Sequence, residues 1–207
     1  TNVMSFGYQV LGFGVVTPGG LSPLTDITAS MWDGDTGKYT LSGNDVVKSG
    51  TPSGTFSNIR IKNSAPVLDG DFVWQYVQSP GNGGGNTDSS FGFYDISEDS
   101  TWSSTLYQQK LNLMTNSFWY DMRGGIGSSP FSFQPFEAGT AQGSTQTFLL
   151  GDTFKWQRTG TSLKLFVAGT EKYEWTGVSE SLRFCMSGFT ATPVANRNSA
   201  SDFQFQN

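Results

Sequence analysis

The chain has no histidine and only one cysteine among its 207 residues. Without histidine, the Ser-His and Cys-His pairs that activate nucleophiles cannot form, and zinc sites that use histidine are excluded. The single cysteine, Cys185, cannot form a disulfide within the chain. Because its neighbours Leu182, Phe184 and Met186 are apolar, we expect it to be a small core residue. We assign no catalytic residue from these residue types.

Charged residues and long apolar runs are also scarce. Asp, Glu, Lys and Arg make up 14% of the chain, the formal net charge is −5, and the basic residues are scattered. A nucleic-acid backbone needs a concentrated basic surface, so nucleic acid is not an expected partner. No apolar run approaches the roughly 20 residues that a membrane-spanning helix needs, so we expect no membrane insertion.

Glycine, by contrast, is abundant at 26 residues, and serine, threonine and asparagine are frequent. This composition favours short strands joined by turns over long helices, whose exposed faces usually carry Glu and Lys. The length suits a single sizeable core. We therefore predict an all-β fold, an antiparallel two-sheet β-sandwich, in one domain that spans residues 25–207. Residues 1–24 are predicted to form an N-terminal arm or linker that holds at most one strand.

Alternation of apolar and polar residues marks the strands of this domain. The run DFVWQYVQ at 71–78 is typical, because Phe72, Trp74 and Tyr76 fall on one face of an extended chain. Similar runs are found at 39–41, 46–48, 56–63, 91–96, 172–177, 181–189 and 201–206.

Three other segments are less regular. SPGNGGGNTDSS at 79–90 cannot bury enough apolar surface to order itself, and we predict a long loop there. Segment 104–125 is expected to hold two strands around Asn116, with a helix over 106–114 as the alternative. The Gly/Ser/Pro-rich segment 124–147 is assigned no strand.

The most regular stretch is FLLGDTFKWQRTGTSLKLFVAG at 148–169. Phe154 and Trp156 share one face of its first strand, and Leu163 and Leu165 share one face of the returning strand. A Thr-Gly-Thr turn joins the two strands. We predict a β-hairpin at this point.

This hairpin and the order of the strands around it resemble the concanavalin A-like lectin/glucanase superfamily, particularly its laminin G-like, SPRY-like and viral or phage fibre modules. The resemblance covers about 27–207 in layout. It implies a jelly roll of two curved sheets, in which the hairpin is scaffold. The residues that carry it are Gly151, Asp152, Phe154, Trp156, Arg158, Gly160, Leu163, Leu165, Phe166, Ala168 and Gly169.

Part of this superfamily consists of glycoside hydrolases. Retaining hydrolysis needs two carboxylates about 5–5.5 Å apart, and the family's glucanases present them as Glu-x-Asp-x-x-Glu on one strand. This chain has no such pattern, and its carboxylate clusters at 95–99 and 171–174 are spaced differently and lie beside turns. We therefore expect a non-enzymatic protein, and a glycoside hydrolase with an unrecognised carboxylate pair is an alternative.

Calcium is a candidate ligand, although no cofactor is required. Asp33 and Asp35 flank a glycine, as do Asp69 and Asp71, and calcium prefers several hard oxygen ligands in flexible geometry. Asp-Gly is also an ordinary turn dipeptide, so each pair has a purely structural alternative.

A glycan is the favoured partner. Sugars stack their C–H faces on exposed aromatic rings, while polar groups bind the hydroxyls. The galectin His-Asn-Pro-Arg signature is missing, so no particular sugar is implied. The candidate ligand-binding residues lie beside turns or in polar loops: Trp32, Trp102, Trp119, Tyr120, Asn86 and Asp88.

We therefore predict a surface recognition module for a glycan or cell-surface polymer, as part of a viral or phage particle. The alternative is a capsid, fibre or filament subunit without a small ligand, in which residues 1–16 and the long loop contact neighbours in a homo-oligomer or particle. Both interpretations place the chain outside the cell or on a virion surface.

Overall fold

The computed structural model describes residues 23–48, 56–65, 68–79, 87–102, 111–124, 131–178, 181–189 and 199–207. In these ranges the regular structure consists of strands and short 3-10 helices, which confirms the all-β prediction. None of the helices in these ranges is long and apolar enough to cross a membrane. Nearly all of the predicted arm at 1–24 lies outside the described residues.

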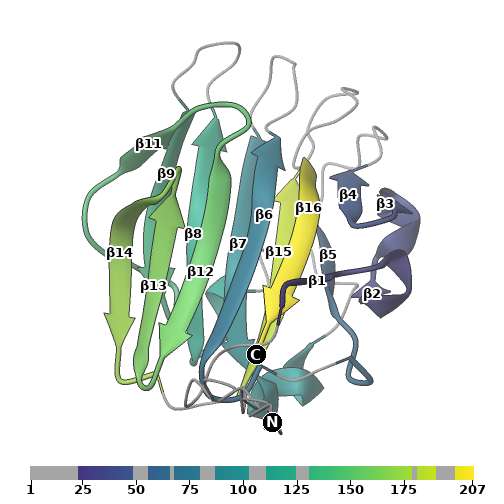
Figure 1. Ribbon diagram of the computed structural model, residues 1–207, viewed down its shortest axis with the longest axis horizontal. Coiled ribbons are helices and arrows are strands. Elements are labelled where there is room, and N and C mark those ends of the chain that lie inside the picture. Colours follow the sequence, from purple (N-terminus) through teal and green to yellow (C-terminus); the bar gives the residue numbers. More distant parts are fainter. Residues whose placement is uncertain are drawn as a thin grey trace, which may run out of the picture.

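The strands form two antiparallel sheets, which face one another in Figure 1. Sheet A contains β1 (Thr25–Asp26), β3 (Tyr39–Ser42), β4 (Asp45–Lys48), β6 (Phe72–Ser79), β12 (Thr153–Thr159), β13 (Ser162–Val167), β14 (Thr170–Thr176) and β16 (Ser199–Gln206). Sheet B contains β2 (Trp32–Gly34), β5 (Phe56–Ile61), β7 (Thr87–Asp95), β8 (Ser117–Gly124), β9 (Phe131–Glu137), β10 (Thr140–Ala141), β11 (Gln146–Phe148) and β15 (Leu182–Phe189). The 3-10 helices are η1 (Ala29–Met31), η2 (Thr36–Lys38), η3 (Ile96–Thr101) and η4 (Leu111–Leu113).

Strands that are distant in the sequence lie side by side in each sheet. The order is β14-β13-β12-β6-β16-β4-β3 in sheet A, with β1 against β16, and β10-β9-β8-β7-β15-β5-β2 in sheet B, with β11 against β9. The C-terminal strand β16 thus runs between β6 and β4. The two-sheet sandwich predicted from the sequence is confirmed.

Large aromatic side chains fill the space between the sheets. The hairpin is formed by β12 and β13, in which Trp156 pairs in register with Leu165, and on its other side β12 places Trp156 opposite Trp74 of β6. The rings of Trp156 and Trp175 stack with their centroids 5.2 Å apart. Full burial of one such ring stabilises the fold by roughly 2–3 kcal/mol, so this hairpin has a structural role.

A chain of hydrogen bonds links four of the polar side chains that lie within this core. Trp156 Nε1 donates to the Tyr76 hydroxyl at 3.4 Å, the Tyr76 and Tyr120 hydroxyls are 2.8 Å apart, and Tyr120 donates to Gln78 Oε1 at 3.1 Å. Burial raises the pKa of Tyr76 and of Tyr120, so both hydroxyls stay protonated and can donate.

The structure corrects three boundaries. The predicted loop at 79–90 is too long, because Thr87–Ser90 belong to β7. Segment 124–147, which is assigned no strand from the sequence, holds β9, β10 and β11. The predicted helix alternative at 106–114 is a 3-10 turn where it is described, at Leu111–Leu113, and one strand, β8, follows Asn116.

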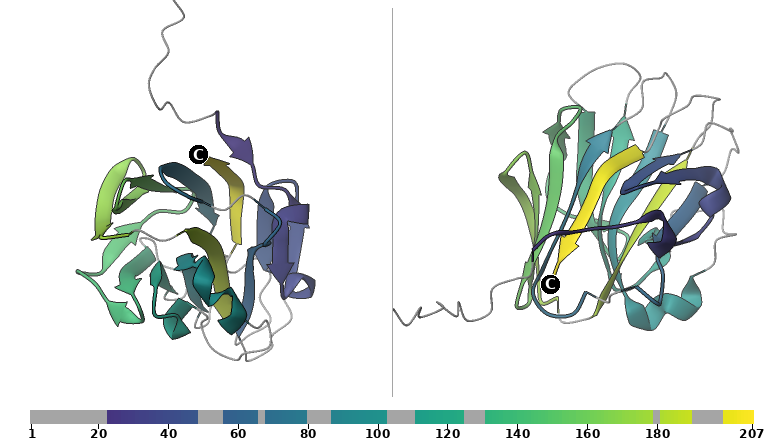
Figure 2. Two further views of the ribbon diagram at one scale, coloured as in Figure 1. Left: turned by 90° about the horizontal axis from the view of Figure 1, so that it is seen from below. Right: turned by 45° about the vertical axis from the view of Figure 1, so that its right-hand side comes forward.

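The outer face of sheet B, which points away from sheet A, is covered by a second layer of side chains. Leu111 and Met114 form a separate apolar cluster with Tyr94, Trp119, Phe136 and Cys185, and Trp102 packs against it. In the left view of Figure 2, the short helical segments in teal lie on this side of the sandwich. Cys185 is buried as predicted, but in this outer cluster and not between the sheets.

Candidate functional site

The outer face of sheet B carries a row of polar side chains in register across five neighbouring strands. We call this set the polar row: Asn58 of β5, Ser187 of β15, Ser90 of β7, Asp121 of β8 and Gln134 of β9. Its first four members are at most 3% exposed. Within the described residues, the hydroxyls of Ser90 and Ser187 have no hydrogen-bond partner.

Beside the polar row lies a network of charged groups centred on Asp99. Arg183 donates to both carboxylate oxygens of Asp99, from Nε at 3.0 Å and from Nη2 at 2.8 Å. Arg60 Nη1 donates to the same carboxylate at 2.8 Å, and the Tyr94 hydroxyl donates at 2.7 Å. Burial raises the pKa of Tyr94, so its hydroxyl remains a donor. The network fastens η3 to the outer face of sheet B.

Trp102 lies on top of this network and is partly exposed. Its ring stacks on Tyr94 with centroids 6.1 Å apart and an interplanar angle of 9°. The guanidinium carbon of Arg60 is 5.1 Å from the Trp102 ring centroid. We call Trp102, Tyr94 and Arg60 the Trp102 platform.

The Trp102 platform brings together two residues that the sequence analysis assigned to different sites. Asp33 of β2 has a side chain that is 51% exposed, and its Oδ2 lies 3.7 Å from Arg60 Nη2. The neighbouring Gly34 has a φ of +105°, and a Cβ added to it would lie 3.4 Å from Trp102 Cζ2 and 2.5 Å from the Asn58 carbonyl oxygen. Glycine is therefore required where β2 passes Trp102.

Three of the predicted site aromatics are buried, which corrects the expectation that they lie beside loops with exposed rings. Trp32 is 2% exposed and packs edge-on against Phe203 in the core. Trp119 is 1% exposed and stacks on Phe136. Tyr120 is fully buried in the hydrogen-bond chain between the sheets. A sugar cannot stack on these rings in this structure.

The two polar candidates from the long loop are placed only in part. Asn86 lies outside the described residues. Asp88 belongs to β7, where its backbone pairs in register with Arg123 of β8. The roles assigned to both residues remain predictions.

The four aspartates considered for calcium each accept a hydrogen bond within the chain. Asp33 accepts from the Gly34 amide at 2.8 Å, and Asp35 accepts from the Asn58 amide at 3.1 Å. Asp71 accepts from the Gly160 amide at 2.7 Å, and Asp69 accepts from the Ser181 hydroxyl. In the described part of the chain, no three His, Cys, Asp or Glu residues group around a common point. Calcium binding remains a prediction from the sequence.

The carboxylates on the outer face of sheet B are relevant to whether this face could catalyse glycoside hydrolysis. Among the described residues of the polar row, Asp121 is the single carboxylate. The nearby Asp99 is held by two arginines and a tyrosine, which fixes it as an acceptor. Glycoside hydrolysis needs a second carboxyl group that can donate or accept a proton near the first.

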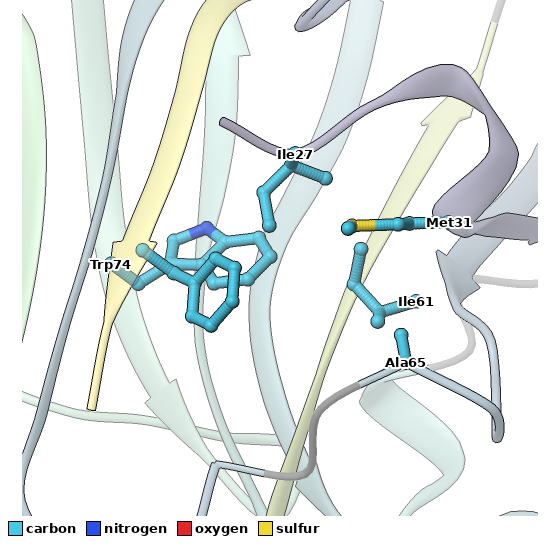
Figure 3. Close-up of a pocket in the computed structure, with 6 residues that line it drawn as sticks. Ile27, Met31, Ile61, Ala65 and Trp74 are labelled. Atoms are coloured by element: carbon cyan, nitrogen blue, oxygen red, sulfur yellow. The ribbon is translucent and has the colours of Figure 1, made fainter. Parts of the chain in front are cut away.

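A small cavity lies elsewhere, at the margin of the space between the sheets. Figure 3 shows its lining, which consists of Ile27, Met31, Ile61, Ala65, Trp74 and Phe205. Its free space is on the order of one water molecule, and its lining is apolar except for one indole nitrogen. It contains none of the predicted site residues and is too small for a sugar ring.

A scan against protein-family models finds no match to this chain, and no curated protein matches it either. Solved structures do match. The endo-1,3-beta-glucanase from Streptomyces sioyaensis aligns with a TM-score of 0.61 at 10% identity, over 90% of this chain and 95% of the glucanase. The potassium-bound carbohydrate recognition domain of Emp46p aligns with a TM-score of 0.54 at 15% identity, over 86% of this chain and 85% of that domain.

A third match, the endo-beta-1,3-glucanase from Pyrococcus furiosus, has a TM-score of 0.55 at 10% identity and covers 90% of this chain and 94% of that enzyme. The fold is the concanavalin A-like jelly roll. This confirms the resemblance inferred from the hairpin. The matched jelly rolls include a lectin domain and glucanases, so the fold occurs in proteins that bind sugars and in proteins that cleave them.

Sequence reasoning did not find the network that supports Trp102 in this jelly roll. Arg60, Arg183 and Asp99 come from β5, β15 and η3, which are far apart in the sequence. The sequence feature that could have indicated this network is the acidic cluster at 95–99, whose spacing does not fit the catalytic pattern of the glucanases. Its members have structural contacts, since Asp95 caps η3 through the Ser97 amide, Glu98 binds the Asn116 amide, and Asp99 binds both arginines.

Proposed function

We propose that this jelly roll is a non-enzymatic glycan-binding module whose binding surface includes the Trp102 platform. The observation that carries the proposal is the partly exposed Trp102 ring, stacked parallel on Tyr94 and close to Arg60, which also lies beside the exposed Asp33 carboxylate. A pyranose stacks its apolar face on such a ring and donates its hydroxyl protons to a neighbouring carboxylate. The Arg60 guanidinium and the parallel Tyr94 ring both contact the Trp102 ring and hold it in one orientation.

The solved structures that resemble this chain also support a sugar ligand. A carbohydrate recognition domain and endo-1,3-beta-glucanases are among them, and these likenesses extend over most of the chain. Binding without cleavage is favoured because the sequence has no Glu-x-Asp-x-x-Glu pattern of the kind that the glucanases of the superfamily present. An extracellular or virion-surface location belongs to the same proposal, because cell-surface and polymer glycans are found outside the cell.

A glycan array that includes β-1,3-glucan oligosaccharides tests this proposal. We expect the wild-type chain to bind at least one glycan, and Trp102→Ala to weaken that binding about tenfold or more. Asp33→Asn should weaken it less, because the amide keeps one acceptor oxygen. Binding that is equally strong in Trp102→Ala would move the site away from the Trp102 platform.

The hydrolase alternative has its own assay. The chain is incubated with β-1,3-glucan, and new reducing ends are measured against a matched Asp121→Asn variant. We expect no difference between the two proteins. Release of reducing ends by the wild-type chain that is lost in Asp121→Asn would identify an enzyme instead.

A further inference from the structure

Asp99 and Trp102 are linked directly through the backbone. Both belong to the turn formed by η3 and its C-cap, where the Trp102 amide donates to the Asp99 carbonyl at 3.2 Å. In a 3-10 helix, side chains three residues apart lie one above the other. The Asp99 carboxylate and the Trp102 ring therefore project toward the same face of sheet B.

Two side chains of sheet B contact both residues. Arg60 donates to Asp99 Oδ1 at 2.8 Å, and its guanidinium carbon is 5.1 Å from the Trp102 ring centroid. Tyr94 donates to the same oxygen at 2.7 Å, and its ring stacks on Trp102. The two side chains that contact the Trp102 ring, Arg60 and Tyr94, are thus the same side chains that the Asp99 carboxylate orients.

Arg183 anchors the network to the sheet. Its side chain is 4% exposed, and besides its two bonds to Asp99 it donates to the Ile61 carbonyl at 3.1 Å and to the Lys62 carbonyl at 2.7 Å. A guanidinium that makes four hydrogen bonds is held rigidly. The position of η3 on the sheet therefore depends on the bonds between this guanidinium and the Asp99 carboxylate.

We infer that Asp99 is a positioning residue for glycan recognition, because it fixes the orientation of the Trp102 ring without contacting the glycan. This inference rests on the proposed function. Glu98, the adjacent carboxylate, provides a matched control. It binds Thr115 and the Asn116 amide, whereas Asp99 binds Arg60 and Arg183.

The test uses the full chain labelled with 5-fluorotryptophan, whose 19F spectrum reports each of its six tryptophans separately. Trp102→Phe assigns the Trp102 resonance. We expect Asp99→Asn to shift this resonance toward that of free fluorotryptophan and to leave the resonances of the core tryptophans in place. Glu98→Gln should leave the Trp102 resonance unchanged. If Asp99→Asn does not fold, Tyr94→Phe, which keeps the stacked ring and removes one donor to Asp99, should shift the same resonance.

Glycan affinity completes the test through a double-mutant cycle. Asp99→Asn should weaken binding by nearly the same factor as Trp102→Ala, and the double variant should bind no more weakly than Trp102→Ala alone. Independent, multiplicative losses would overturn the inference, as would a folded Asp99→Asn protein with an unmoved Trp102 resonance. If the wild-type chain binds no glycan, the proposed function fails, while the 19F result still decides whether Asp99 positions the ring.

Discussion

The outer faces of the two sheets use polar residues in opposite ways. On sheet A, Lys164 pairs with Glu171 at 3.0 Å and with Glu174 at 3.7 Å, and these side chains are 34–44% exposed. On sheet B, Arg60 and Arg183 are less than 10% exposed and share the carboxylate of Asp99. Water solvates the charges on sheet A, whereas the charges on sheet B depend on one another. The difference indicates that the charges of sheet A form a solvated surface, whereas those of sheet B form a largely buried network.

The largest expected effect comes from breaking the network on sheet B. Asp99→Ala leaves two buried guanidinium groups without their carboxylate, and we expect a loss of about 3 kcal/mol in the free energy of unfolding. Urea denaturation followed by tryptophan fluorescence measures it. A loss below about 0.5 kcal/mol would mean that these charges are as well solvated as those on sheet A.

Gly92 on β7 tests how closely the strands of sheet B approach each other. A Cβ at this position would lie 2.3 Å from the Phe118 carbonyl oxygen and 2.4 Å from Trp119 Cβ. We expect Gly92→Ala to cost about 2–3 kcal/mol, because the contacts are with backbone and Cβ atoms that cannot rotate away. Gly37→Ala is the control, since nothing lies within 4 Å of its added Cβ. Equal midpoints for the two variants would contradict the close approach.

A buried lysine on the inner side of sheet A can be tested through the pH dependence of the free energy of unfolding. Lys48 is 2% exposed and donates to Ser57 Oγ at 3.0 Å, and its burial lowers its pKa to about 8. Between pH 8 and 10 the unfolded chain retains a proton that the folded chain has lost, so stability should rise by about 2 kcal/mol. Above pH 10 the buried tyrosines, whose pKa values are raised, reverse the trend.

Unfolding free energies measured from pH 7 to 10 on the wild type and on Lys48→Met check this prediction. The variant should lack the rise, because it carries no titrating amine between the sheets. A parallel rise in both proteins would assign the pH dependence to another group.

The smallest effect is expected on the outer face of sheet A. Glu171→Ala removes the nearer partner of Lys164, and we expect no measurable shift of the unfolding midpoint, because exposed ion pairs contribute little. Thermal unfolding at low salt, where such pairs are strongest, is the most sensitive measurement. A clear destabilisation there would remove the contrast between the two faces.

Sequence patterning predicted the jelly roll because a strand with one buried face and one solvent-exposed face shows a clear alternation of apolar and polar residues. The β12–β13 hairpin of sheet A fits that description, with Trp156 and Leu165 inside and Lys164 outside. On sheet B the pattern was misleading, because both faces are covered. Trp119 points away from the inner core and is still buried, under the layer that includes Leu111 and Met114.

The candidate site was predictable only in part for the same physical reason. Trp102 was predicted to bind a glycan and Asp33 to bind calcium, and the structure places the two residues together around Arg60. Their support was not predictable, since Arg183 lies 84 positions from Asp99 in the sequence. Local spacing does not report contacts that depend on the order of strands in a sheet.

The most direct test of glycan recognition on sheet B is a calorimetric titration of the best array glycan into the wild type and two matched variants. Trp102→Ala removes the partly exposed ring on sheet B, and Phe166→Ala removes a partly exposed ring on sheet A that lies under Lys155. We predict an affinity loss of about tenfold or more for Trp102→Ala and an unchanged affinity for Phe166→Ala. Equal affinities for all three proteins, or a loss confined to Phe166→Ala, would contradict the account.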